Sequence, residues 1–184
     1  MARGKVRVVI VCEDRPQEHF VRALCEKIGP VHVVIAPGHG SAEQWVRMQY
    51  PKDVKKLRGH GDERVGLSVM TDGDRFGVDH RKQSLSKALV EAGHAQRAEH
   101  ERIAIMVPTW SIETWLAWLC GLEGLDELTK YKDDPRIKAA QRAKSVSPTK
   151  AAAAWFEAPR QDAAARLPSL LDGRGELLRL TTEG

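Results

Sequence analysis

The chain has 184 residues, 42% of them hydrophobic, which is enough for one well-formed core and hardly for two. Its formal net charge of +4 permits contact with a polyanion such as nucleic acid without demonstrating it. No apolar run approaches the roughly 20 residues of a membrane span, so the sequence argues against a membrane protein. The three cysteines lack the spacing of metal ligands, and the first five residues lead straight into a strand. We therefore expect free thiols, no signal peptide and a cytoplasmic protein.

The first two thirds of the chain alternate between predicted strands and helices. Apolar runs with many β-branched residues predict strands at 6–12, 31–36, 65–71 and 102–107. Apolar residues at helical spacing predict helices at 16–28, 41–48, 84–92 and 112–119. Tyr50 and Pro51 are expected to interrupt the second helix, with a short basic turn or helix at 52–57 after it. This alternation predicts an α/β fold with a mostly parallel four-stranded sheet flanked by helices.

The last third of the chain is rich in alanine and predicted to be helical. Helices are expected at 135–144, 148–156 and 161–171, and the tail at 177–180 is the remaining strand candidate. We expect residues 1–119 to form the α/β core and residues 120–184 to form a helical extension packed on that core, the two together making one domain.

Acidic residues follow two of the predicted strands. Glu13 and Asp14 come directly after the first strand, and Asp72 and Asp74 follow the third strand on either side of Gly73, where the backbone turns sharply. Acids at the end of a buried strand are costly unless a cation meets them, and a hard divalent ion prefers oxygen ligands. The ligand crevice of an open parallel sheet lies at the carboxyl ends of its strands. If the two strands are neighbours, Glu13, Asp72 and Asp74 converge there and form a metal site.

The order of these motifs resembles the Toprim domain, the metal-dependent catalytic module of topoisomerases, bacterial primases and OLD-family nucleases. The segment 11–20 (VCEDRPQEHF) is most similar to the first motif of OLD and small stand-alone Toprim-like proteins. Glu13 stands at the position of the invariant acid, Asp14 replaces a glycine, and Gln17-Glu18 replaces a threonine-glutamate pair. The Asp-Gly-Asp at 72–74 matches the second motif, and 107–116 (VPTWSIETWL) is similar to an Ile-Glu-x-Trp helix of small members. The resemblance covers about residues 5–119 and implies a Toprim-like (Rossmann-like) fold.

A Toprim domain of this type implies a nuclease that cleaves phosphodiester bonds with Mg²⁺ or Mn²⁺. Glu13, Asp72 and Asp74 would be the main metal ligands and catalytic residues, and Glu13 would also exchange protons with the reacting group. Glu18 and Glu113 would ligate a second ion or orient its surroundings. DNA is expected in preference to RNA, in a defence or DNA-processing system. Because the chain has no Walker-type phosphate loop, an ATPase would be a separate subunit.

Several candidate residues also have an ordinary structural explanation. Glu18 and Glu113 are explained equally as acids near the N-terminus of a helix, where the helix dipole favours negative charge. OLD enzymes carry a functional lysine after the acidic motifs, which makes Lys150 or Lys144 a candidate for offsetting charge on the scissile phosphate. Lys150 is our candidate catalytic lysine, and Arg142, Lys144 and Lys150 are candidates for nucleic-acid binding. The alternative for these three is an ordinary solvated helix face.

Three functions stay open on the sequence. The first is the Mg²⁺-dependent nuclease. The second is a non-catalytic Toprim-like module that binds nucleic acid or a partner, which Asp14 at the glycine position favours. The third is a metal-dependent phosphatase or phosphotransferase on a related α/β sheet. His39 and His60 each lie between glycines and either touch phosphate or belong to ordinary solvent loops.

Overall fold

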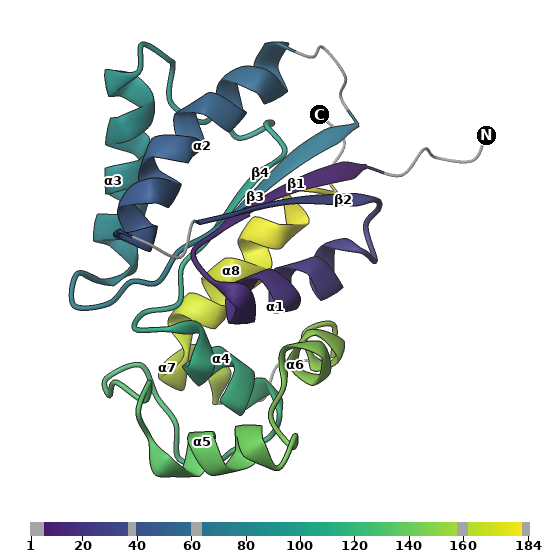
Figure 1. The fold of residues 1–184 in the computed structure, drawn as a ribbon, viewed down its shortest axis with the longest axis vertical. Coiled ribbons are helices and arrows are strands. Elements are labelled where there is room, and N and C mark those ends of the chain that lie inside the picture. The colour runs from purple at the N-terminus through teal and green to yellow at the C-terminus, as the bar shows by residue number, and fades with distance from the viewer. Residues whose placement is uncertain (1–5, 37–39, 60–63, 158–161, 182–184) are drawn as a thin grey trace.

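The computed structural model describes residues 6–36, 40–59, 64–157 and 162–181; His39, His60 and the first five residues lie outside these ranges. The described residues form four strands, β1 (Arg7–Cys12), β2 (Val31–Ile35), β3 (Val65–Met70) and β4 (Ile103–Met106). The sheet has the order β2-β1-β3-β4, and every neighbouring pair is parallel. The prediction of an α/β fold with a four-stranded parallel sheet is therefore confirmed (Figure 1).

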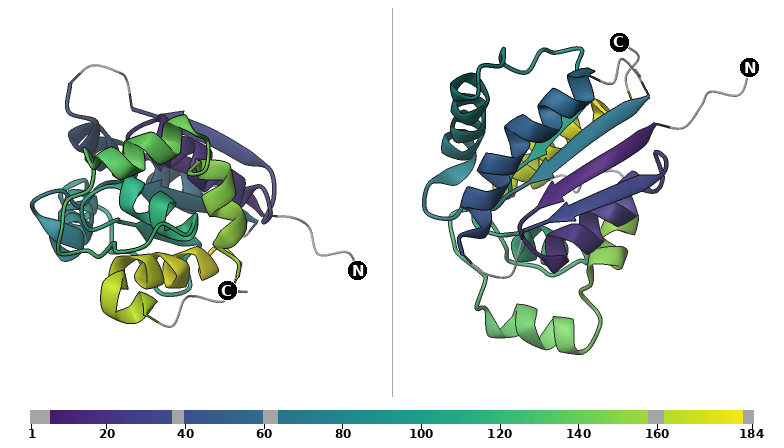
Figure 2. Two further views of the ribbon diagram at one scale, coloured as in Figure 1. Left: turned by 90° about the horizontal axis from the view of Figure 1, so that it is seen from below. Right: turned by 45° about the horizontal axis from the view of Figure 1, so that its top comes forward.

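Helices cover both faces of the sheet. The described helices are α1 (Arg15–Cys25), α2 (Ala42–Gly59), α3 (Gly77–Glu91), α4 (Ile112–Leu119), α5 (Pro135–Arg142), α6 (Pro148–Ala154), α7 (Ala163–Arg166) and α8 (Pro168–Leu178). As Figures 1 and 2 show, α2 and α3 lie on one face and α1 and α8 on the other. Helices α4 to α7 gather beyond the carboxyl ends of the strands, and α6 packs against α1 and α4. None of the described helices combines the length and the apolar character needed to cross a bilayer.

Alternate side chains of the central strands build two apolar clusters. Ile10 and Met70 point to the α1 and α8 side, whereas Val11 and Val69 point to the α2 and α3 side. This two-sided burial follows from the period of two in a strand that is covered on both faces, and it explains the nearly continuous apolar runs in the sequence. The first cluster also contains apolar residues from beyond position 119: Leu125, Tyr131, Ile137, Val146, Trp155, Leu170 and Leu177. The helical extension therefore completes the core of the α/β sheet.

Helix α8 protects the exposed edge of the sheet. Strand β4 is an edge strand, and the buried carboxylate of Glu176 in α8 accepts a hydrogen bond from the backbone N–H of Ile105 at 3.0 Å. Arg97 donates to the carbonyl of Ile103 at 2.9 Å and pairs with Glu176. These contacts satisfy backbone groups that an uncovered edge would offer to another chain.

Three expectations for individual helices and strands were wrong. Helix α2 continues through Pro51, because Tyr50 and Val54 are buried against the sheet and that packing outweighs the loss of one backbone hydrogen bond. The expected helix at 161–171 is divided, since Leu167 precedes Pro168 and takes a non-helical conformation (φ −130°, ψ 64°). In the last strand candidate, 177–180, the first two residues instead end α8 and the other two form a turn.

Candidate functional site

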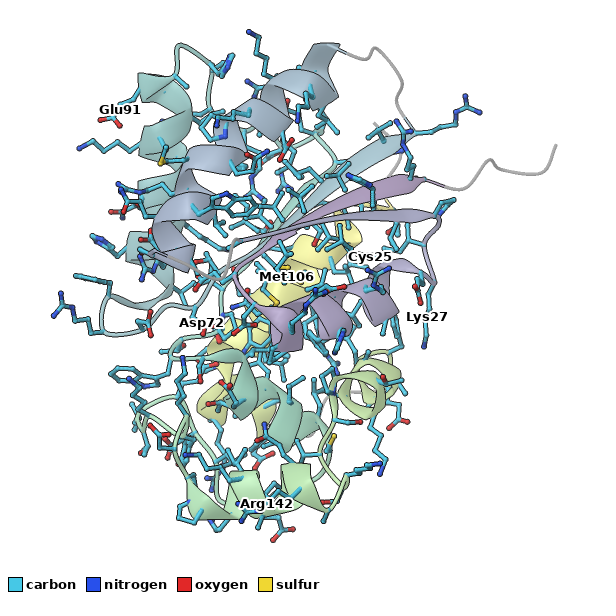
Figure 3. The ribbon with its side chains drawn as sticks, viewed as in Figure 1. Cys25, Lys27, Asp72, Glu91, Met106 and Arg142 are labelled. Carbon is cyan, nitrogen blue, oxygen red and sulfur yellow. The ribbon has the colours of Figure 1, made fainter. Side chains whose placement is uncertain are left out.

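The sheet has a topological switch point between β1 and β3. The chain leaves β1 toward β2 on one side and returns to β3 on the other side, so the segments that follow β1 and β3 diverge and open a crevice at the carboxyl edge. The two strands are neighbours, so the condition on which the convergence of the acids depended is met. Glu13 and Asp72 follow the two strands directly, and Figure 3 shows Asp72 between the strand ends and the helical layer of α4 to α7.

A fully buried glutamine joins the two segments. The Oε1 atom of Gln17 accepts a hydrogen bond from the backbone N–H of Glu13 at 3.0 Å, and its Nε2 donates to Oδ1 of Asp72 at 2.9 Å. Asp14 positions the glutamine, because it is the N-cap of α1 and accepts from the backbone N–H of Gln17 at 3.0 Å. Pro16 suits the first turn of the same helix. The glutamine therefore fixes the distance between the β1 and β3 loops.

Glu13 and Asp72 are held by further donors. Oε1 of Glu13 accepts from the backbone N–H of Asp72 at 3.0 Å and from the hydroxyl of Thr71. Oδ1 of Asp72 accepts a second hydrogen bond, at 3.2 Å, from the backbone N–H of Ile112 in the first turn of α4. The side chain of Ser111, the N-cap residue of α4, makes no capping hydrogen bond. Asp72 thus satisfies an orphan donor of α4 from a segment 40 residues away.

The segment after Asp72 is tightly constrained. Gly73 donates to the carbonyl of Pro108 at 2.8 Å, and a Cβ atom at this position would lie 2.8 Å from that oxygen and closer still to the Thr109 carbonyl. Only glycine therefore allows this close approach of the two backbones. Asp74 has a left-handed conformation (φ 49°), which a short polar side chain tolerates.

Arg81 fastens the same segment from α3. Its buried guanidinium donates to the backbone carbonyl of Asp72 at 2.9 Å and lies 3.4 Å from the carboxylate of Asp74. It also pairs with Glu43 of α2 at 2.8 Å. A single cation therefore connects two helices to the loop that carries the two aspartates. Among the described residues Asp72 has no salt bridge of its own.

The acids at this edge destabilise one another's charges. Burial, followed by the charges of Glu13, Glu113 and Asp14, raises the pKa of Asp72 well above its usual value. Burial also raises the pKa of Glu13, against the hydrogen bonds from Thr71 and Asp72, and it raises the pKa of Asp14. Oε2 of Glu113 is buried and has no hydrogen-bond partner among the described residues. The result is a concentration of negative potential that a cation would relieve.

The donor set has the right chemistry for a hard cation, since it is made of carboxylate oxygens and one of them is buried without a donor. Within the described ranges, however, no group of three or more His, Cys, Asp or Glu residues stands close enough to hold a metal ion. Oε1 of Glu13 and Oδ1 of Asp72 accept hydrogen bonds from protein donors. The described acids therefore lie near one another without forming a complete set of metal ligands.

Lys132 is a functional candidate that the sequence did not reveal. This exposed residue lies in the segment between α4 and α5. Burial alone would lower its pKa, but the charges of Asp72, Glu113, Asp74 and Asp14 together raise it. The charges of the acids in both loops therefore act on its ammonium group. No local motif marks this lysine, because its position depends on the path of a segment without regular structure.

Glu127 anchors the segment that carries Lys132. Its carboxylate accepts hydrogen bonds from the hydroxyl of Thr109 at 2.6 Å and from the backbone N–H of Ser169 at 3.1 Å. Its backbone carbonyl accepts from Nε1 of Trp110 at 3.1 Å. The segment between α4 and α5 is thereby fixed to the β4–α4 loop, which in turn contacts Gly73.

Two other predicted metal ligands, Glu113 and Glu18, differ in their surroundings. Glu113 in the first turn of α4 lies close enough to raise the pKa of Asp72, as expected from its position after β4. Glu18 is buried, and its two oxygens pair with Arg15 at 2.5 Å and Arg22 at 2.7 Å on its own helix. The structural explanation of Glu18, as an acid in the first turn of α1, therefore accounts for its contacts.

The predicted basic residues form a separate surface. Arg142, Lys144 and Lys150 are exposed, and Nζ of Lys150 donates to the backbone carbonyl of Lys144 at 2.7 Å. We call these three residues the basic segment. Their roles in catalysis and nucleic-acid binding stay predictions.

Comparison of the chain with models of protein families, with curated proteins and with solved structures found no match. The Toprim resemblance thus rests on the motifs alone.

Proposed function

We propose that this protein is a divalent-metal-dependent nuclease whose active site is the acidic edge between β1 and β3. The observation that carries the proposal is the convergence of Glu13, Asp14, Asp72 and Glu113 at the switch point, where burial and like charge raise the pKa of Asp72. Such perturbed carboxylates, brought together from distant segments, are typical of catalytic sites. The Toprim-like order of the motifs and the mild positive charge of the chain agree with a polyanionic substrate.

Under this proposal each residue of the site has its own role. Glu13 and Asp72, with Asp74 or Glu113, would hold Mg²⁺ or Mn²⁺, which supplies charge neutralisation at the phosphate and stabilises the leaving oxygen. The raised pKa of Glu13 suits a group that exchanges a proton with the reacting oxygen. Lys132, whose pKa the same acids raise, would offset charge that develops on the phosphate. Gln17 holds the two loops at a fixed separation.

The finer parts of the proposal follow the resemblance. They are a Toprim domain, DNA as the substrate, a defence or DNA-processing system in the cytoplasm, and a separate ATPase subunit as partner. Lys132 joins Lys150 as a candidate for offsetting charge on the phosphate, because the charges of the acids raise its pKa.

Cleavage of supercoiled plasmid tests the proposal. Wild type with Mg²⁺ or Mn²⁺ should nick or linearise the plasmid, and Glu13→Gln and Asp72→Asn should lower the rate by a factor of about 100 or more. Lys132→Gln should also lower the rate. Glu91→Gln, an exposed acid near the end of α3 (Figure 3), is the matched control and should cleave as wild type does. Equal rates for wild type, Glu13→Gln and Asp72→Asn would refute the proposal.

A binding module is the second candidate function. It is favoured by the hydrogen bonds that already occupy Glu13 and Asp72, and by the lack of a finished ligand set within the described ranges. DNA binding without nicking in any divalent ion, unchanged by Asp72→Asn, would select this function. Turnover of a small phosphate ester with the plasmid intact would instead select a phosphatase or phosphotransferase.

A further inference from the structure

A cavity of about 450 Å³ lies beside the acidic edge, between α1, α4 and the segment that joins α5 to α6. Pro16, Leu116 and Val146 contribute an apolar lining, and Leu116 and Val146 are themselves buried. Arg15, His19 and Gln141 contribute polar groups and are exposed to solvent. A cavity of this size with an apolar lining and a few polar groups is typical of a site for a small planar ligand.

The cavity continues the proposed active site along the same two helices. Arg15 and Pro16 directly follow Asp14 in α1, and Leu116 follows Glu113 by one helical turn in α4. Because a helix rises about 1.5 Å per residue, the step from Glu113 to Leu116 is only about 4.5 Å along the axis. Both helices therefore run from the acidic edge into the lining of the cavity.

The basic segment borders the other side of the cavity. Gln141 precedes Arg142, and Val146 lies between Lys144 and Lys150. Among the described residues, no carboxylate lies within ion-pair distance of Arg142, Lys144 or Lys150, although neighbouring Arg136 and Lys138 each pair with an aspartate. The positive charge of the basic segment is therefore available to a polyanion, and Figure 3 shows Arg142 on the far side of the helical layer from the sheet.

We propose that this cavity holds one unpaired nucleobase of a nucleic-acid strand. On one side of that base the phosphates of the strand would lie along the basic segment, and on the other side the next phosphate would lie at the acidic edge. The base would lie against Pro16, Leu116 and Val146, with the amide of Gln141 toward its polar edge and Arg15 or His19 beside its phosphate. A base paired in a duplex cannot enter such a cavity unless it is flipped out. The inference rests on the proposed nuclease function for the acidic edge, and it narrows the substrate to single-stranded or locally unpaired nucleic acid.

Binding in EDTA tests the cavity without requiring cleavage. Fluorescence anisotropy would compare labelled single strands of about 20 nucleotides, as DNA and as RNA, with a duplex of the same sequence. Wild type should bind a single strand more tightly than the duplex. Gln141→Trp, which fills the cavity from an exposed position, should raise the Kd for the single strand about tenfold, the range expected for losing one stacked base. Its Kd for the duplex should change less than twofold.

Two further variants make the result decisive. Gln83→Trp, at an exposed position of α3 on the opposite face of the sheet, is the matched control and should bind as wild type does. Gln141→Leu keeps the approximate size of the side chain and should weaken the single strand without affecting the duplex. Unchanged binding of both single strands by Gln141→Trp, or wild-type preference for the duplex, would overturn the inference. Plasmid cleavage in Mg²⁺ is measured separately, so it would still decide the proposed function.

Discussion

Glu176 connects α8 to the edge strand of the sheet, and replacing it with alanine should destabilise the protein strongly. Its side chain is 9% exposed and is shared by Arg97, Lys82 and the backbone N–H of Ile105. Truncation leaves the Arg97 guanidinium, itself 20% exposed, without its carboxylate and leaves the edge N–H without an acceptor. Removing one partner of a buried ion pair costs about 3–5 kcal/mol. That is a large part of the roughly 5–15 kcal/mol that stabilises a typical domain.

Urea unfolding followed by circular dichroism measures this loss. With a slope of about 2 kcal/mol per molar urea, the midpoint of Glu176→Ala should fall by about 2 M relative to wild type. Asp172→Ala is the matched control, because Asp172 pairs with the same Lys82 from the same helix but is 41% exposed. An exposed pair contributes less than about 1 kcal/mol, so the control should shift the midpoint only slightly.

The pH dependence gives an independent check through Glu176→Gln. Burial alone would raise the pKa of Glu176, but the hydrogen bonds from Arg97 and Ile105 hold it below its usual value. The ionised carboxylate therefore stabilises the protein above the unfolded pKa of about 4.3, and this contribution is lost as the pH falls through the folded pKa. The deficit of Glu176→Gln should shrink in acid. Two results would refute this reasoning. One is a urea midpoint of Glu176→Ala that is no lower than that of Asp172→Ala, and the other is a stability deficit of Glu176→Gln that stays the same in acid.

Asp72→Asn should raise the melting temperature at neutral pH, because burial and the charge of Glu13 penalise the ionised carboxylate in the folded state. The gain should disappear below a pH of about 4, where the unfolded aspartate is also neutral, and calorimetric melts across this range check it. Gly73→Ala should cost about 1–3 kcal/mol in urea unfolding, since its methyl group would press on the Thr109 carbonyl. Replacing the three residues of the basic segment with glutamine should reduce the slope of log K against log salt for single-stranded DNA by about 2, as anisotropy titrations would show.

The parts of the molecule that the sequence predicted are those that depend on local patterns. Apolar, β-branched runs located all four strands, and the acids after β1 and β3 were found because they interrupt such runs. The adjacency of β1 and β3 was a hypothesis from the sequence, and the structure confirms it, so Glu13 meets Asp72 as that hypothesis required. The continuation of α2 through Pro51 was not, because helix propensity is weak beside the burial of Tyr50.

The contacts that complete the site were decided by tertiary structure alone. Gln17 joins Glu13 to Asp72, and Asp72 caps α4. The charges of the acids also act on Lys132, which lies in a segment without regular structure. None of these contacts follows from periodicity, because each joins residues far apart in the chain. Their partners are chosen by where the packed helices place them. Local sequence encodes the direction of a side chain relative to its own strand or helix, but the position of one element against another is set by the sum of many weak packing contacts across the whole core.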